Sequence, residues 1–286
     1  MRSVSHANQH YVPRFLLEQW HTPPDNKLTA FRWTDKHLLN HRYKAKSVAK
    51  ERHLYSLERS KGEPDVQVER DFLGPHIDDP ASVVHAQLLS HGVSNLTREE
   101  KMTWSPFLIS LLLRAPPMIA HLRKRGREIL SAGLDVAPEE YLVVRGTEPE
   151  TTLRGWVEKH QPDVLDDLGV MTLPKLVQSN KLNLAILNVT WVTRALDRSK
   201  FDLLIGDHPL ILSGSFETSF LLALPLSPRR MFLAFNDNRT FENIKSFDDT
   251  GFVRTANVST VSSAERYVYA PNAIQEPLIK KLLRRS

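Results

Sequence analysis

The segment FDLLIGDHPLIL, residues 201–212, carries the pattern that decides the fold class. It consists of two apolar runs separated by the turn-forming tetrapeptide Gly206–Pro209. Two further apolar segments follow, SFLLALPLS at 219–227 and RRMFLAFN at 229–236. Short apolar runs bounded by Pro, Gly and Ser are typical of strands in a largely buried sheet. The C-terminal third of the chain therefore predicts a sheet.

Strands are also expected near the N-terminus. LTAFRW at 28–33 and LLNHRYKAKSV at 38–48 are rich in aromatic and branched residues, and the polar tetrapeptide TDKH lies between them. Two such runs around a short polar connection predict a β-hairpin. We therefore predict an α+β fold in which N-terminal and C-terminal strands form one mixed sheet.

The region between the two sets of strands predicts a central helical layer. Apolar side chains in residues 65–190 recur mainly at helical spacing. Thr97 followed by Glu100 matches a capping box, in which each side chain binds a main-chain N–H at the start of a helix. We expect one α+β domain, residues 1–286, with residues 65–190 as a predominantly helical insertion or subdomain.

The composition excludes several kinds of site. The 286 residues include no cysteine, which excludes disulfides, thiolate zinc sites and cysteine nucleophiles. The opening residues MRSVSHANQH lack the apolar stretch of a secretory signal, and no apolar run reaches the roughly 20 residues of a membrane span. We expect a cytoplasmic protein without a membrane partner.

Positive charge is concentrated in one segment. The net charge is +5, and residues 36–53 alone hold six Lys or Arg, one Glu and three His. Smaller basic clusters occur at 121–127 and at the C-terminus. Such a segment can attract the phosphates of a nucleic acid or nucleotide, or an acidic partner, and it can also be a solvated basic face.

The motif NQHYVPRF near the start of the chain places Gln9, His10 and Arg14 around a proline. Pro13 biases the residue before it toward extended geometry, so we expect His10 to lie outside a helix. The four-residue spacing of His6 and His10 would suit two metal ligands only on one helical face. His10 and Arg14 either belong to a functional site or cap a turn and pair with a carboxylate.

Three other polar residues stand in apolar surroundings. Asp207 follows a buried strand at a turn, which is a recurring position for catalytic carboxylates and also for an Asx-turn. Arg114 ends the apolar run LISLLLR, and we expect it to snorkel to solvent or to pair with a carboxylate such as Glu69 or Asp207. Arg229 in LPLSPRRMF either receives an anion or lies in a solvated turn.

Signatures of the common enzyme classes are missing from the sequence. It contains no phosphate-cradling Gly-rich loop, no His-Glu-x-x-His, no Gly-x-Ser-x-Gly elbow and no kinase motif set. The presence of only 11 glycines also disfavours a loop-cradled nucleotide. A reaction type therefore has to be inferred from the individual polar residues.

Six segments together resemble one protein family. They are NQHYVPRFLL, ERHLYS, FLISLLLRAP, LLIGDHPLIL, LPLSPRRMFL and NVSTVSSAERYVYA, in this order along the chain. The chain is similar to members of the domain of unknown function 4238 family, which is found widely in bacteria. The resemblance implies that His10, Arg14, Arg114 and Asp207 belong to shared motifs, and it implies no reaction. His208 departs from the family pattern, in which Asn more often precedes the proline.

Our first functional hypothesis is a hydrolase that acts on a phosphate-containing substrate, such as a nucleotide or nucleic acid. His10 would be the general acid or base. Asp207, with Glu69, would orient His10 or hold a divalent metal ion as cofactor. Arg14 and Arg114 would stabilise negative charge. Two further residues would contact the substrate, Gln9 and Arg229.

The second hypothesis is a binding module without chemistry. The basic segment 36–53 would hold nucleic acid or an acidic partner, and the motif residues would form an ion-paired scaffold. The sequence leaves the oligomeric state open.

Overall fold

The chain forms two compact units, and each is built from several stretches of sequence. The computed structural model describes residues 7–58, 63–136, 138–144, 146, 150, 152–215 and 218–284. The first unit contains Met1–Gln9, Glu51–His76 and Pro116–Gln178. The second unit contains His10–Lys50, Ile77–Ala115 and Ser179–Ser286. The predicted limits of a helical insertion, residues 65 and 190, stay a prediction.

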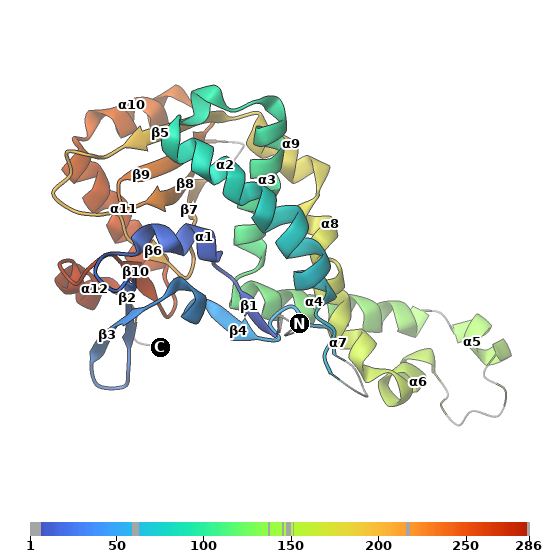
Figure 1. Ribbon diagram of the computed structural model, residues 1–286. Coiled ribbons are helices and arrows are strands. Elements are labelled where there is room, and N and C mark those ends of the chain that lie inside the picture. The colour runs from blue at the N-terminus through green and yellow to red at the C-terminus, as the bar shows by residue number, and fades with distance from the viewer. Residues whose placement is uncertain are drawn as a thin grey trace, which may run out of the picture. The chain divides into compact units, whose positions relative to one another are not determined.

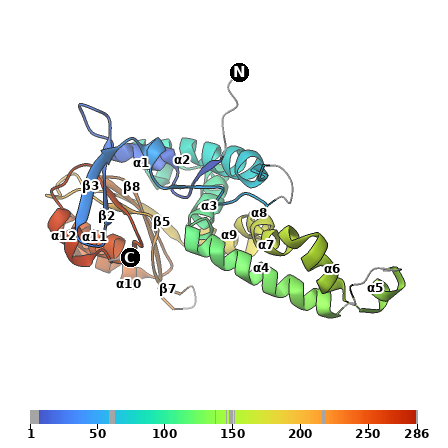
Figure 2. The ribbon, with the colours of Figure 1, turned by 90° about the horizontal axis from the view of Figure 1, so that it is seen from below.

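Helices make up most of the first unit (Figures 1 and 2). They are α4 (Pro116–Val136), α5 (Pro138–Val144), α6 (Leu153–His160), α7 (Pro162–Met171) and α8 (Leu173–Val177). Helices α4 and α7 lie side by side and touch through two glycines. A Cβ atom on Gly126 would lie 2.5 Å from the backbone nitrogen of Gly169. The missing side chains allow the two helix backbones to come this close.

One four-stranded antiparallel sheet forms the centre of the second unit. Its order is β5 (Thr190–Ala195), β9 (Arg230–Phe235), β8 (Phe220–Ser227) and β7 (Ile211–Gly214). Helices α2 (Asp79–Ser90) and α3 (Arg98–Leu113) cover one face, where Trp104 packs edge-on against Phe232. Helices α10 (Asn238–Ser246) and α11 (Asp249–Ser263) lie on the other face (Figure 1).

A second antiparallel sheet joins the two ends of the sequence. Its order is β3 (Leu38–Tyr43), β2 (Leu28–Trp33), β10 (Val268–Ala270) and β6 (Ile205–Gly206). Residue Val268 of β10 pairs with Phe31 on one side and with Gly206 on the other. Helix α12 (Glu276–Leu282) packs on this sheet through Ile279. The predicted α+β class and the meeting of terminal strands are confirmed.

Both four-stranded sheets are antiparallel, whereas we predicted a mixed sheet. Strands β2 and β3 are connected by a short turn, and so are β8 and β9. A short hairpin connection can only produce an antiparallel pair, because a parallel pair needs a crossover. The capping box at the start of α3 is confirmed, since the Thr97 hydroxyl accepts from the N–H of Glu100, whose carboxylate accepts from the N–H of Thr97.

Residues 201–212 connect the two sheets of the second unit. The chain leaves the terminal sheet at β6 and enters the central sheet at β7. The tetrapeptide with Asp207 and Pro209 forms the corner between them. This arrangement explains why an apolar segment is interrupted by turn-forming residues at this point.

The remaining elements are short. They are β1 (Asn8–His10), α1 (Arg14–Leu17), β4 (Lys50–Arg52), α9 (Asn180–Leu187), the 3-10 turns Glu18–Trp20, Ala45–Ser47 and Val93–Asn95, and the π-helical segment Val68–Asp78. Strand β1 pairs with β4.

Candidate functional site

His10 lies at the end of strand β1, outside any helix, as Pro13 predicted. It is partly buried, and an N–H of its ring donates to the backbone carbonyl of Lys46. Burial, together with the charges of Lys50 and Arg14, lowers the pKa of His10 from 6.5 to about 4. The imidazole is therefore neutral near pH 7, although cations surround it. His6, whose spacing from His10 would suit two metal ligands only on a helical face, lies outside the described residues.

Four cations lie on or beside the segment that contacts His10, and we call them the basic cluster. They are Arg14, at the start of α1, and three lysines of the segment that follows β3, Lys44, Lys46 and Lys50. Within the part of the chain that the structure describes, none of the three lysines forms an ion pair with a carboxylate. The Lys44 and Lys46 side chains are exposed. Their charge is therefore available to an anion from solvent.

The loop that carries these lysines has a well-anchored backbone. The N–H of Ala45 donates to Nε2 of His21 at 3.0 Å, and the N–H of Tyr11 donates to the carbonyl of Ala49 at 3.0 Å. Ala49 has a φ of 50°, in the left-handed region that residues other than glycine rarely adopt. Such a conformation costs about 1 kcal/mol and persists only where the surroundings enforce it. The fixed backbone holds Lys46 and Lys50 at defined positions.

Two cavities flank this loop. The first has a volume of about 470 Å³ and is lined by Arg14, Lys44 and Lys46 together with Glu18 and His21. Glu18 is the carboxylate of this lining, and it forms an exposed ion pair with Arg14 at 3.5 Å. The charged side chains of the lining thus sum to two positive charges. We call this space the lysine cavity.

The second cavity, the tyrosine cavity, has a volume of about 270 Å³. Its lining includes Tyr11, Tyr43 and Tyr267 together with the cations Arg32 and Lys50, and no carboxylate. The ring of Tyr43 lies 6.3 Å from that of His41 in an edge-to-face arrangement. Aromatic faces beside cations are suited to planar, electron-rich groups that carry a negative charge.

Arg114 is completely buried and pairs with a carboxylate, which is one of the two alternatives expected from its apolar context. Its Nη1 donates to both carboxylate oxygens of Asp78, at 2.9 and 3.1 Å. The guanidinium also lies 5.8 Å from the centre of the Phe107 ring. We had considered Glu69 and Asp207 as partners and had not considered Asp78. Burial raises the pKa of Asp78, and the charge of Arg114 opposes that rise.

Asp207 is buried and binds the main chain of a distant segment. Its Oδ1 accepts from the N–H of Glu265 at 3.0 Å, and its Oδ2 accepts from the N–H groups of Arg266 and Tyr267 at 2.7 and 2.9 Å. The bonds of an Asx-turn would instead reach two residues along the chain. Main-chain binding accounts for the aspartate at this corner, and its catalytic role stays a prediction.

The remaining predicted residues are distributed over both units. Gln9, in the first unit, is buried, donates to the Ser56 hydroxyl at 3.1 Å and accepts from the N–H of Tyr55 at 2.5 Å. Glu69 lies in the first turn of the π-helical segment, also in the first unit. Arg229, in the second unit, donates to the Ser199 carbonyl at 2.6 Å and pairs with Asp202.

The structure therefore brings together only part of the predicted set. His10 lies within the electrostatic reach of Arg14 and Arg114. Gln9, Asp207 and Arg229 each form hydrogen bonds with the main chain. Glu69 lies in the first unit, whereas His10 lies in the second. Sequence reasoning identified the basic segment but not its individual lysines. The alternation of these lysines with the small residues Ala45, Ser47 and Ala49 could have indicated them. Small side chains let a loop pack closely against the protein while the lysine side chains between them stay exposed.

No three His, Asp or Glu side chains among the described residues are gathered so that they could hold a metal ion. No single helix in the same set is both long and apolar enough to cross a membrane.

Comparison with known proteins places the chain in a family. No curated protein and no solved structure matches it. Residues 8–273 match the family described as "Protein of unknown function (DUF4238)", and this range includes His10, the basic cluster, Arg114 and Asp207. The resemblance predicted from the sequence motifs is confirmed, and the chain belongs to the DUF4238 family.

Proposed function

We propose that this protein binds single-stranded nucleic acid through the basic cluster and the tyrosine cavity. The observation that carries the proposal is the placement of Arg14 beside Lys44 and Lys46, with Lys50 on the same segment as the two lysines, whose backbone is fixed. Proteins that bind single strands combine a positive surface for the phosphates with aromatic side chains on which bases stack. The proposed surface offers both.

The charges favour a phosphate chain over a single small anion. The four cations are spread over two adjoining cavities, and the lining of each has a net positive charge. A strand whose phosphates lie along the lysine cavity could place a base in the tyrosine cavity. Stacking on an aromatic ring contributes about 1–3 kcal/mol per base and tolerates any base. We therefore expect binding with little sequence preference.

Fluorescence anisotropy with a labelled single-stranded oligonucleotide tests this proposal. Phosphate contacts release counterions, so the logarithm of the binding constant falls with the logarithm of salt concentration by about 0.7 per contact on a single strand. Contacts from all four cations of the cluster would give a slope of about −2.8. Binding that does not respond to salt, or no binding at low salt, would refute the proposal.

A matched pair of charge-reversal variants locates the surface. Lys44→Glu combined with Lys46→Glu should weaken binding by roughly tenfold or more and make the salt slope shallower by about 1.4. Lys280→Glu combined with Lys281→Glu is the control, because both residues are exposed on α12 and the net charge changes equally. Equal weakening by the two double variants would mean that net charge, and not this surface, attracts the strand.

Cleavage of the bound strand is a second candidate function, and the placement of the His10 imidazole beside Arg14 and Lys50 favours it. A neutral imidazole among cations can accept a proton while Arg14 and Lys50 stabilise negative charge on a phosphate. His10→Gln should then bind the oligonucleotide and fail to cleave it. Incubation of a labelled strand with the wild type and the variant, with and without Mg²⁺, decides this point. A strand left intact by the wild type would eliminate cleavage and leave binding.

A further inference from the structure

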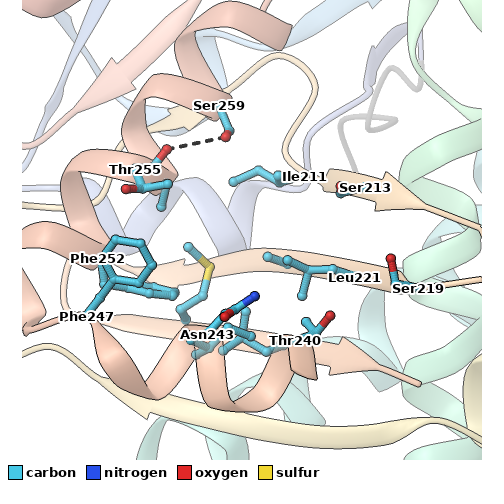
Figure 3. A pocket seen from close by; sticks show the side chains of 15 residues that line it. Ile211, Ser213, Ser219, Leu221, Thr240, Asn243, Phe247, Phe252, Thr255 and Ser259 are labelled. Atoms are coloured by element: carbon cyan, nitrogen blue, oxygen red, sulfur yellow. Dashed lines mark hydrogen bonds between the residues drawn. The ribbon is translucent and has the colours of Figure 1, made fainter. Parts of the chain in front are cut away.

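A third cavity in the second unit lies on the opposite side of the central sheet from α2 and α3 (Figure 3). Its volume is about 260 Å³. Its floor is one face of the central sheet. Alternate residues of a strand point to the same face, and each of three strands contributes two such residues. These are Ile211 and Ser213 of β7, Leu221 and Ala223 of β8, and Met231 and Leu233 of β9. Helices α10 and α11 supply its walls.

No charged side chain lines this cavity, although a quarter of the chain is charged. Its polar groups are the hydroxyls of serines and threonines and the amide of Asn243. Phe247 and Phe252 lie at one end of the cavity, whereas Ser213 and Ser219 lie at the other (Figure 3). A charged ligand would lose its hydration here without gaining a counter-charge. The lining thus selects for an uncharged ligand.

The polar groups differ in their hydrogen bonds to the protein. The Thr240 hydroxyl donates to Asp237 at 2.7 Å, and the Ser259 hydroxyl donates to the carbonyl of Thr255 at 3.3 Å. The side-chain amide of Asn243 and the Ser213 hydroxyl form no hydrogen bond with other described residues. Both can therefore bond to a polar group of a ligand.

We propose that this cavity binds a small uncharged amphiphile, whose apolar body lies against the phenylalanines and whose hydroxyl or amide group lies toward Ser213 and Asn243. The volume is well above that of an apolar cavity of about 150 Å³ that accommodates benzene, and slightly below the roughly 300 Å³ of the smallest drug-sized pockets. A molecule of the size of an eight-carbon alcohol fits this range. The proposal is independent of nucleic-acid binding, which uses charged residues on another surface.

Methionine methyl signals provide a local measurement. The chain has five methionines, and Met231 lines the cavity while Met102 is exposed on α3. With methyl-labelled methionine, titration of 1-octanol into the whole protein should shift the Met231 signal saturably and leave the Met102 signal in place. Octanoate and octylammonium have the same chain with a charged end. They should bind at least roughly tenfold more weakly, because the cavity offers no counter-charge.

Filling the cavity should abolish the response. Leu221→Trp places an indole in the cavity, and Ile211→Trp does so from the neighbouring strand if the first variant does not fold. Leu212→Trp is the matched control, because Leu212 is 48% exposed and lies on the opposite face of β7.

Any of three results would overturn the proposal. One is a Met231 signal that octanol does not move. Another is an equal response to octanol and to the two charged probes. The third is an unchanged response in a folded variant whose cavity is filled.

Discussion

Asp207 and Tyr267 bind each other through a reciprocal pair of hydrogen bonds. The N–H of Asp207 donates to the carbonyl of Tyr267 at 3.0 Å, and the N–H of Tyr267 donates to the Asp207 carboxylate at 2.9 Å. The same carboxylate accepts from the two preceding N–H groups. The corner between the two sheets is thereby attached to the turn that leads into β10.

Replacing Asp207 should therefore destabilise the protein. Asp207→Asn puts an amide nitrogen where the carboxylate accepted an N–H, so it should lower the free energy of unfolding by about 2–3 kcal/mol. Urea denaturation measures the change. Asp197→Asn, at an exposed turn, should change it by less than about 0.5 kcal/mol. A neutral or stabilising effect of the Asp207 variant would instead indicate a residue held in place for function.

Breaking the buried pair of Arg114 and Asp78 should be costly. Arg114→Met leaves the partly buried carboxyl group of Asp78 without its cation, and it should destabilise the protein by about 3 kcal/mol. Adding Asp78→Leu should restore part of that loss, because an apolar pair leaves no buried charge. Arg125→Met is the control, since Arg125 forms an exposed pair with Glu128. A double variant no more stable than Arg114→Met would contradict this explanation.

His10 should make stability depend on pH. Its pKa is about 4 in the folded protein and 6.5 in the unfolded chain, so the unfolded chain binds the proton more tightly. The contribution of His10 is present above pH 6.5 and is lost as the pH falls from 6.5 towards 4. Between about pH 7.5 and about pH 5, wild type should lose about 2 kcal/mol more stability than His10→Gln. Equal losses in urea denaturation at both pH values would show that His10 is not the group responsible.

Tyr43 should contribute to binding through its ring and not through charge. Tyr43 is 40% exposed and lines the tyrosine cavity. Tyr43→Leu should weaken oligonucleotide binding by about 1 kcal/mol and leave the salt slope unchanged, because no phosphate contact is lost. Tyr43→Phe keeps the ring and should bind like the wild type. Anisotropy titrations at several salt concentrations check both expectations, and a changed slope in the leucine variant would assign Tyr43 a different role.

The crossing of α4 and α7 should not tolerate a side chain. A Cβ atom on Gly169 would lie 2.0 Å from the carbonyl oxygen of Leu122, so Gly169→Ala should lower stability by about 3 kcal/mol. Gly133→Ala, in α4 with nothing within 4 Å of the added carbon, should raise it by about 0.5–1 kcal/mol. Urea denaturation of the two variants gives this comparison. Equal effects would show that the helices can move apart.

Local sequence patterns predicted several features that the structure confirms. The capping box at Thr97 and the hairpin of β2 and β3 depend on neighbouring residues and were visible as short motifs. The predicted strand at 38–48 was too long, because β3 ends at Tyr43 and the following residues form the lysine-bearing loop. Strand limits depend on the partner strand, which the sequence of one segment does not contain.

The candidate site was only partly predictable, because its contacts also depend on partners that the sequence of one segment does not contain. Arg114 in an apolar helix could snorkel to solvent or pair with a carboxylate, and among 33 acidic residues spacing could not identify Asp78 as the partner. Pro13 placed His10 outside a helix, but the lowered pKa of His10 depends on burial and on the charge of Lys50, which lies far along the chain. Desolvation and distant charges are properties of the folded chain.

The sequence by itself determined the α+β class, the pairing of terminal strands, the concentration of cations in one segment and the family. These depend on residue type and periodicity, which the sequence contains directly. Only the tertiary structure decided that Asp207 binds main chain nearly sixty residues away and that His10 lies near Lys46 and Lys50. It also decided that a cavity without charged side chains lies beneath α10 and α11. Each of these requires segments that are distant in sequence to pack together, and packing sets burial, charge proximity and empty volume at once.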